Sequence, residues 1–169
     1  VIPIFRNQIK EGGPITLTDP EMTRFVMNVE QAVKLVVDSA YKACGGEVFI
    51  TKMPVIRIKD LAEVMIEELS GLYKQDPKSI KIKIIGAKPG EKLYEELMSS
   101  EETGRAVELD NYFSVLPAFK DLYREIKYEY DGFISSEVTN PYISQNEPAM
   151  SIKELRAFLN ESKLLSEFE

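Results

Sequence analysis

The sequence predicts a mixed α/β fold, an α+β-like arrangement in which helices pack around a small mixed sheet. Helical and extended patterns alternate along the chain, and the extended patterns are few and short. Hydrophobic residues make up 44% of the 169 residues and charged residues 29%, which is typical of one globular domain. With so little sheet of its own, such a piece is expected to cap a larger sheet supplied by another segment.

Proline, glycine and polar caps delimit the first two helices. Pro3 suits the first turn of a helix over 1–11, and the two glycines that follow this range end it. Asn28 and Gln31 fit a capping box that begins the next helix, which also ends at a glycine pair. This second helix carries an apolar stripe that consists of Val29, Ala32, Val33, Val36, Val37 and Ala40.

Periodicity and turn residues predict the remaining elements. Helices are expected over 58–73, 91–99 and 118–130, and a capped final helix over 151–160. Extended segments are expected at 14–18, 23–27, 47–51 and 79–85, and twice within 105–116. The segment 131–150 is rich in Ser, Asn, Pro and Tyr, and it is expected to form an ordered loop or latch.

Charge and composition argue against several classes of function. The net charge is −7 and the isoelectric point about 4.9, whereas a nucleic-acid partner usually requires a basic surface. The absence of histidine excludes a Ser-His-Asp triad and a histidine-ligated zinc site. The single cysteine, Cys44, cannot form an internal disulfide, so we expect a reducing, cytoplasmic location. No segment approaches the roughly 20 apolar residues that span a bilayer, so no membrane span is expected.

The chain carries no recognisable cofactor loop or catalytic pair. Neither a G-x-G-x-x-G nor a Walker A sequence occurs, so no cofactor is assigned to this chain, and no metal site is expected. Tyr123 and Lys127 match a Tyr-x-x-x-Lys spacing, but they lie on a charged amphipathic segment late in the chain. We therefore predict no catalytic residue here and expect the chain to be inactive alone.

The first candidate binding segment surrounds Arg24, at the start of an extended segment just before a helix. A guanidinium in this position can clamp a phosphate in bidentate fashion. The alternative is a surface arginine paired with Asp19 or Glu21.

The second candidate segment is the loop Gly86–Lys92, between an expected strand and an expected helix. Ligand-binding loops of α/β proteins occupy such places. Lys88 can meet a phosphate, and Glu91 can accept hydrogen bonds from ribose hydroxyls. The alternative is a plain turn in which Glu91 favours the helix dipole.

Taken together, two motifs resemble one family. The first motif comprises Val1-Ile2-Pro3-Ile4-Phe5, Gln8-Ile9, Gly12-Gly13-Pro14, Thr16, Thr18-Asp19-Pro20, Met22-Thr23-Arg24-Phe25 and Met27. The second comprises Gly86, Lys88-Pro89-Gly90-Glu91-Lys92-Leu93 and Glu95-Glu96-Leu97. They resemble the inverting UDP-N-acetylglucosamine 4,6-dehydratases and their capsular-polysaccharide relatives in the extended short-chain dehydrogenase/reductase superfamily. The resemblance covers 1–117, which we expect to be the UDP-sugar-binding region, with 118–169 as a carboxyl-terminal extension.

The resemblance implies roles for individual residues. Arg24 is similar to the arginine that contacts the diphosphate, and Lys88 stands where the family usually has arginine. Glu91 is similar to the residue that holds the ribose. Three further residues belong to segments similar to those that flank the uracil, namely Pro3, Thr16 and Thr18.

The resemblance also implies an enzyme in two parts. A Rossmann domain, in the same or a separate chain, would hold NAD(P) and a Tyr-x-x-x-Lys pair, for which this chain has no counterpart. The complete enzyme is expected to be a homo-oligomer and to use a UDP-sugar as substrate. Three alternatives remain: a fragment of a UDP-sugar 4-epimerase, a non-catalytic sugar-nucleotide-binding module, and a protein interaction domain.

Overall fold

The computed structural model describes residues 1–87, 89–119 and 126–166 and divides the chain into two compact units. The first unit comprises Val1–Val26, Pro54–Glu95 and Glu147–Glu169, and the second comprises Met27–Met53 and Glu96–Asn146. Both units are therefore assembled from segments distant in the sequence. The expected division at residue 117 was placed where the motif resemblance ends, and it remains a prediction about function.

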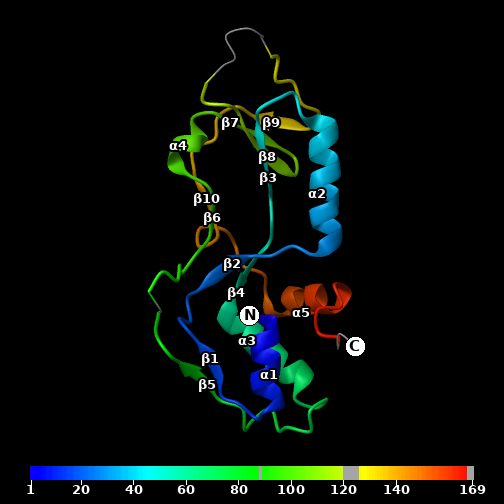
Figure 1. Ribbon diagram of the computed structural model, residues 1–169, viewed down its shortest axis with the longest axis vertical. Helices are drawn as coiled ribbons and strands as arrows, with labels where there is room; N and C mark the ends of the chain where they lie inside the picture. Colours follow the sequence, from blue (N-terminus) through cyan, green and yellow to red (C-terminus); the bar gives the residue numbers. More distant parts are fainter. Residues whose placement is uncertain (88, 120–125, 167–169) are drawn as a thin grey trace. The chain divides into compact units, whose positions relative to one another are not determined.

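The first unit combines three helices with two short strand pairs (Figure 1). Its elements are α1 (Ile2–Lys10), β1 (Ile15–Leu17), β2 (Thr23–Phe25), β4 (Val55–Arg57), α3 (Ile58–Leu69), β5 (Ile82–Ile84) and α5 (Ile152–Glu161). Strand β1 pairs with β5 in parallel, and β2 pairs with β4 in antiparallel orientation. The coarse prediction of a mixed α/β fold with small sheets and several helices is confirmed.

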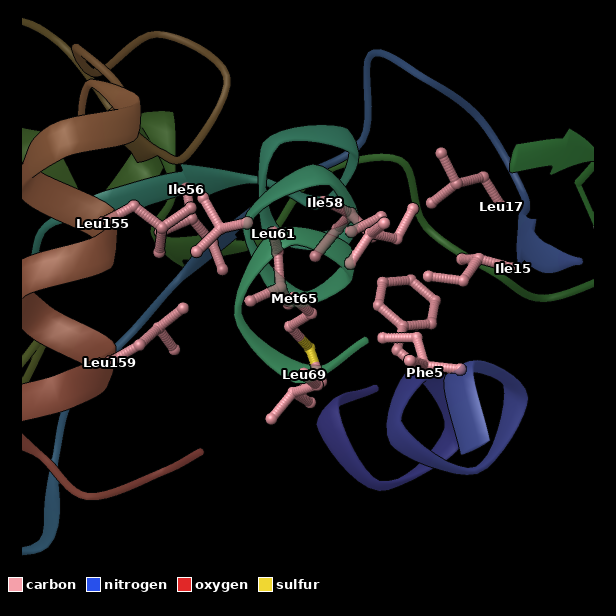
Figure 2. Close-up of a cluster of buried hydrophobic side chains, with 14 of the residues drawn as sticks. Phe5, Ile15, Leu17, Ile56, Ile58, Leu61, Met65, Leu69, Leu155 and Leu159 are labelled. Atoms are coloured by element: carbon pink, nitrogen blue, oxygen red, sulfur yellow. The ribbon is translucent and has the colours of Figure 1, made fainter. Parts of the chain in front are cut away.

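Helix α3 lies at the centre of the core of the first unit (Figure 2). Met65 on α3 is fully buried between Phe5 of α1 and Leu159 of α5. The helix ends at Leu69, earlier than the expected range 58–73, because the chain then turns. Leu72, which lies within the expected range but after the end of α3, is exposed.

The second unit is built on a four-stranded antiparallel sheet with the order β3-β8-β7-β9 (Figure 1). Its elements are α2 (Val29–Lys42), β3 (Val48–Thr51), β6 (Glu96–Met98), α4 (Ser100–Thr103), β7 (Ala106–Leu109), β8 (Tyr112–Val115), β9 (Phe133–Ser135) and β10 (Tyr142–Ile143). Strands β10 and β6 form a separate antiparallel pair.

The prediction of a helix over 91–99 was wrong. The chain is irregular up to Glu95, and β6 follows in antiparallel pairing with β10. Met98 at the end of β6 is fully buried and lies opposite Tyr142. Pairing with a segment distant in the sequence therefore overrides the local helical pattern. Strands β9 and β10 likewise lie within the expected loop 131–150.

Residues 120–125 lie outside the described residues, so the helix expected over 118–130 can be compared with the structure only at its two ends. The described part 126–130 is not helical. The capped final helix is confirmed as α5, where the Ser151 hydroxyl accepts a hydrogen bond from the Glu154 backbone N–H.

Helix α2 is confirmed with its capping box, but its apolar stripe lies exposed. The Asn28 side chain accepts from the Gln31 backbone, and the Gln31 side chain accepts from the Asn28 backbone. None of the 14 residues of α2 is buried. Among the described helices, none has the length and apolar character that a membrane crossing requires.

Candidate functional site

The two sequence motifs meet at one edge of the β1–β5 pair. The Ile15 N–H donates to the Lys81 carbonyl at 2.9 Å, and the Ile85 N–H donates to the Leu17 carbonyl at 2.8 Å. Because the two strands are parallel, the loop that follows β1 and the loop that follows β5 leave the pair at the same edge. In α/β proteins, loops at the carboxyl ends of parallel strands commonly form ligand sites.

Thr18 and Glu91 connect these two loops directly. The Thr18 hydroxyl donates a 2.9 Å hydrogen bond to Oε1 of Glu91. A backbone hydrogen bond of 3.0 Å from Thr23 N–H to the Leu93 carbonyl lies further along the same two loops. The structure thus brings together Thr18 and Glu91, which sequence analysis assigned to different motifs.

Arg24 contacts the second loop as well. Its Nη2 donates to the Lys92 carbonyl at 2.7 Å, and its Nη1 donates to the Thr23 carbonyl at 2.7 Å. Its Nε lies 3.3 Å from a carboxylate oxygen of Glu95. Arg24 is therefore anchored across the two motifs, and its ion-pair partner differs from both candidates of the alternative interpretation.

Helix α1 supports the same edge through Gln8. The Gln8 side-chain amide donates to the Thr16 hydroxyl at 2.8 Å and accepts from the Thr16 N–H at 3.0 Å. These two bonds fix α1 against β1. Pro3 lies in the first turn of α1, where it is exposed to solvent.

Sequence analysis missed Gln8 and Lys83 as candidate site residues. Thr16 and Lys83 are register partners in the β1–β5 pair, so they share one face of the two strands. Lys83 is exposed there and adds a positive charge. In the sequence, the alternation of Lys81 and Lys83 with isoleucines indicated a strand with lysines on one face. The parallel pairing places Lys83 beside Thr16.

Two residues of interest lie outside the described residues, namely Lys88 and Tyr123. The phosphate role of Lys88 therefore stays a prediction. Glu91 does not lie on a helix, which removes the alternative in which its carboxylate favours a helix dipole.

Apart from the Glu154 carboxyl at the start of α5, whose pKa is lowered by hydrogen bonds from Ser151, the groups with shifted pKa values lie in the second unit. Burial alone would raise the pKa of Glu47, but hydrogen bonds from the Cys44 and Gly45 backbone and from the Tyr130 hydroxyl outweigh burial and lower it. Burial, with the adjacent Asp38 carboxylate, raises the pKa of Tyr112 to about 12. These clusters join segments of the unit to one another, so their role is structural.

The described glycines are not arranged as in a dinucleotide-binding loop. A dinucleotide loop leads from a strand through glycines into a helix. Here the glycine pairs follow the helices α1 and α2 and lead into strands. Cβ atoms placed on Gly86 and Gly90 would meet nothing within 4 Å, so that loop does not form a close backbone cradle. No group of three metal-ligating side chains occurs among the described residues.

Comparison with known sequences decides the family. Residues 1–117 match the family described as polysaccharide biosynthesis protein. The chain belongs to this family. A protein of Methanocaldococcus jannaschii named as an uncharacterized membrane protein is 56% identical over 117 residues, which cover 69% of this chain and 35% of that protein.

The similarity to other relatives extends over nearly the whole chain. A UDP-glucose 4-epimerase of Rickettsia bellii is 35% identical over 159 residues, which cover 94% of this chain and 44% of the epimerase. The X-ray structure of Pen from Bacillus thuringiensis matches with a TM-score of 0.81 and 43% identity over 98% of this chain and 46% of that chain. The chain therefore spans less than half the length of these relatives. They support the extended short-chain dehydrogenase/reductase superfamily and nucleotide-sugar biosynthesis.

Proposed function

We propose that the chain is the UDP-sugar-binding part of a nucleotide-sugar enzyme of polysaccharide biosynthesis. The observation that supports this most directly is the hydrogen bond from Thr18 to Glu91, which joins the two motifs at the carboxyl ends of parallel strands. Arg24, with contacts to Lys92 and Glu95, lies across the same two loops.

The proposed roles follow from the chemistry of these groups. The Arg24 guanidinium has five N–H donors, and three contacts within the protein use one on each nitrogen and hold the group in place. The remaining N–H of Nη1 and that of Nη2 donate to the diphosphate. Glu91 accepts hydrogen bonds from the ribose hydroxyls, and Thr18 orients its carboxylate. Lys88 and Lys83 add positive charge for the phosphates, and Pro3 and Thr16 belong to the segments beside the uracil.

For the complete enzyme, we propose a 4,6-dehydratase acting on UDP-N-acetylglucosamine. NAD(P) and the Tyr-x-x-x-Lys pair would belong to a Rossmann domain, in the same or a separate chain. A UDP-sugar 4-epimerase is the second candidate, and the Rickettsia relative with that name favours it. Product analysis of the complete enzyme with UDP-N-acetylglucosamine separates the two, since only dehydration removes the oxygen at C6.

Isothermal titration of the chain with UDP-N-acetylglucosamine, UDP and ADP tests the binding role. A charge-assisted hydrogen bond is worth about 1.5–3 kcal/mol, so Arg24→Ala is expected to raise the Kd roughly ten- to hundredfold. Arg57→Ala is the matched control, because Arg57 pairs in register with Thr23 and therefore lies on the opposite face of the β2–β4 pair. Unchanged affinity in Arg24→Ala, or equal affinity for UDP and ADP, would contradict the proposal.

A further inference from the structure

The Gln8 side chain of α1 covers the free edge of β1. On its other edge β1 bonds to β5 through the Ile15 N–H and the Leu17 carbonyl, so the Thr16 N–H points away from β5. The Gln8 Oε1 atom accepts this N–H at 3.0 Å, and the Gln8 Nε2 atom lies 2.8 Å from the Thr16 hydroxyl oxygen. Helix α1 runs beside β1 (Figure 1), so one side chain reaches both polar groups of Thr16.

These two bonds determine the role that the Thr16 hydroxyl can play. A backbone N–H only donates, so the amide atom that meets it is the oxygen, and the atom that meets the hydroxyl is the NH₂ nitrogen. This nitrogen only donates, so the Thr16 hydroxyl accepts the bond. The hydroxyl hydrogen then remains available, and no hydrogen bond to another described residue uses it. Gln8 thus leaves the Thr16 hydroxyl as a donor.

The side chain next to Thr16 on the neighbouring strand is a donor as well. Thr16 and Lys83 are register partners, and Lys83 is exposed. A lysine ammonium has three donors and no acceptor. Thr16 is only partly buried, so a ligand can reach its hydroxyl. Both side chains therefore fit a ligand group that carries acceptor oxygens.

The position of Thr16 along the chain relates it to the nucleoside. Thr16 lies two residues before Thr18, whose hydroxyl donates to the Glu91 carboxylate. Two residues of extended chain advance by about 6.6 Å, which is comparable to the width of a nucleoside. Where Glu91 holds the ribose, as proposed above, the base attached to that ribose comes beside Thr16.

We propose that Gln8 is a positioning residue that holds the Thr16 hydroxyl as a donor to the 4-carbonyl oxygen of uracil. The inference rests on the proposed function, because it takes the ligand to be a UDP-sugar. Cytosine carries an amino group at position 4, which brings a second donor against the Thr16 hydroxyl and leaves both unpaired. The site therefore prefers UDP to CDP.

Gln8→Glu tests the direction of these hydrogen bonds. A carboxylate only accepts, so it takes both the Thr16 N–H and the hydroxyl hydrogen, and the hydroxyl then offers only its lone pairs to the base. Isothermal titration with UDP and with CDP, at about pH 8 where the glutamate is ionised, gives the ratio of the two Kd values. Asn7→Asp at an exposed position of α1 is the matched control, because it adds the same charge to the same helix. Repulsion of the diphosphate weakens both ligands alike and leaves the ratio unchanged.

We expect the native chain to bind UDP roughly tenfold or more tightly than CDP, and Gln8→Glu to bring the ratio of Kd values close to one. Asn7→Asp should keep the native ratio. Thr16→Val, which removes the hydroxyl, should lower the ratio in the same way, and Thr16→Ser should retain it. Circular dichroism shows which variants keep the native fold, and the two Thr16 variants decide the question if Gln8→Glu does not.

Two results would overturn the inference and leave the proposed function intact. One is a native chain that binds UDP and CDP equally well, and the other is a native ratio retained in folded Gln8→Glu or Thr16→Val. Failure of the native chain to bind UDP at all would contradict the proposed function itself.

Discussion

The Thr18 hydroxyl lies 2.9 Å from a carboxylate oxygen of Glu91, across 73 positions of sequence. This contact joins the loop after β1 to the loop after β5, where the two strands run in parallel. The two motifs that identify the family are therefore parts of one structural feature. Changes on either side of the contact are expected to affect the same binding event.

Thr18→Val tests this connection. The substitution removes the hydroxyl but keeps the shape of the side chain, so Glu91 loses one partner. We expect a loss of stability of about 1 kcal/mol and a several-fold weaker affinity for UDP, measured by denaturation and by titration calorimetry. Thr139→Val at an exposed site is the control. If Thr18→Val and Thr139→Val bind UDP equally well, Thr18 does not orient a ligand-binding carboxylate.

Met65→Ala tests the core of the first unit. Met65 is fully buried on α3, and truncation of such a side chain costs about 2–5 kcal/mol of unfolding free energy. Leu72→Ala removes a side chain of similar size at an exposed position, and a change within about 0.5 kcal/mol is expected. Urea denaturation followed by circular dichroism measures both. Similar losses of unfolding free energy in Met65→Ala and Leu72→Ala would contradict the burial of Met65 and the exposure of Leu72.

Asn28→Ala tests the start of α2. The Asn28 side chain accepts the Gln31 N–H, and removal of such a cap costs about 1 kcal/mol. We expect faster hydrogen exchange in the first turn of α2 and little change in α5. Ser151→Ala, which removes the cap of α5, should produce the reverse pattern. Equal effects of both variants on both helices would contradict local capping.

The lowered pKa of Glu47 predicts that the stability of the protein depends on pH. Its pKa in the folded protein lies below the ordinary value of 4.5, because hydrogen bonds to the carboxylate outweigh its burial. The unfolded chain therefore takes up the proton first on acidification. The contribution of Glu47 to stability is present above pH 4.5 and is lost as the pH falls through the lower folded value.

Glu47→Gln should consequently be less stable than the native protein at pH 6, and the difference should shrink toward pH 3. Urea midpoints at a series of pH values measure this difference. Glu137→Gln, at an exposed position, is the control and should follow the native protein throughout. A difference that stays constant from pH 6 to pH 3 would exclude the proposed electrostatic origin.

Much of the helical structure could be predicted from the sequence. The capping box at Asn28, the cap at Ser151 and the glycines after α1 act within a few residues, so their effects are visible in local sequence. The candidate residues Arg24 and Glu91 were identified in the same way, through motifs that a resemblance to a known family connected.

The failures have a common physical cause. The segment of β6 has a helical pattern, yet pairing with β10 and burial of Met98 decide its conformation. The stripe on α2 was predicted correctly as a pattern, but hydrogen bonds of Asp38 and Lys42 decide which way it faces. Both outcomes depend on partners distant in the sequence, and single-chain periodicity carries no information about them.

The sequence by itself thus determined the helices α1, α2 and α5, the caps at Asn28 and Ser151, and the wider superfamily, because capping, turn formation and short motifs are local properties. The tertiary structure alone decided that Thr18 meets Glu91, that Arg24 pairs with Glu95, and that α2 exposes its apolar side. These relationships arise from strand pairing and packing between distant segments, whose free energies depend on the folded arrangement of the chain.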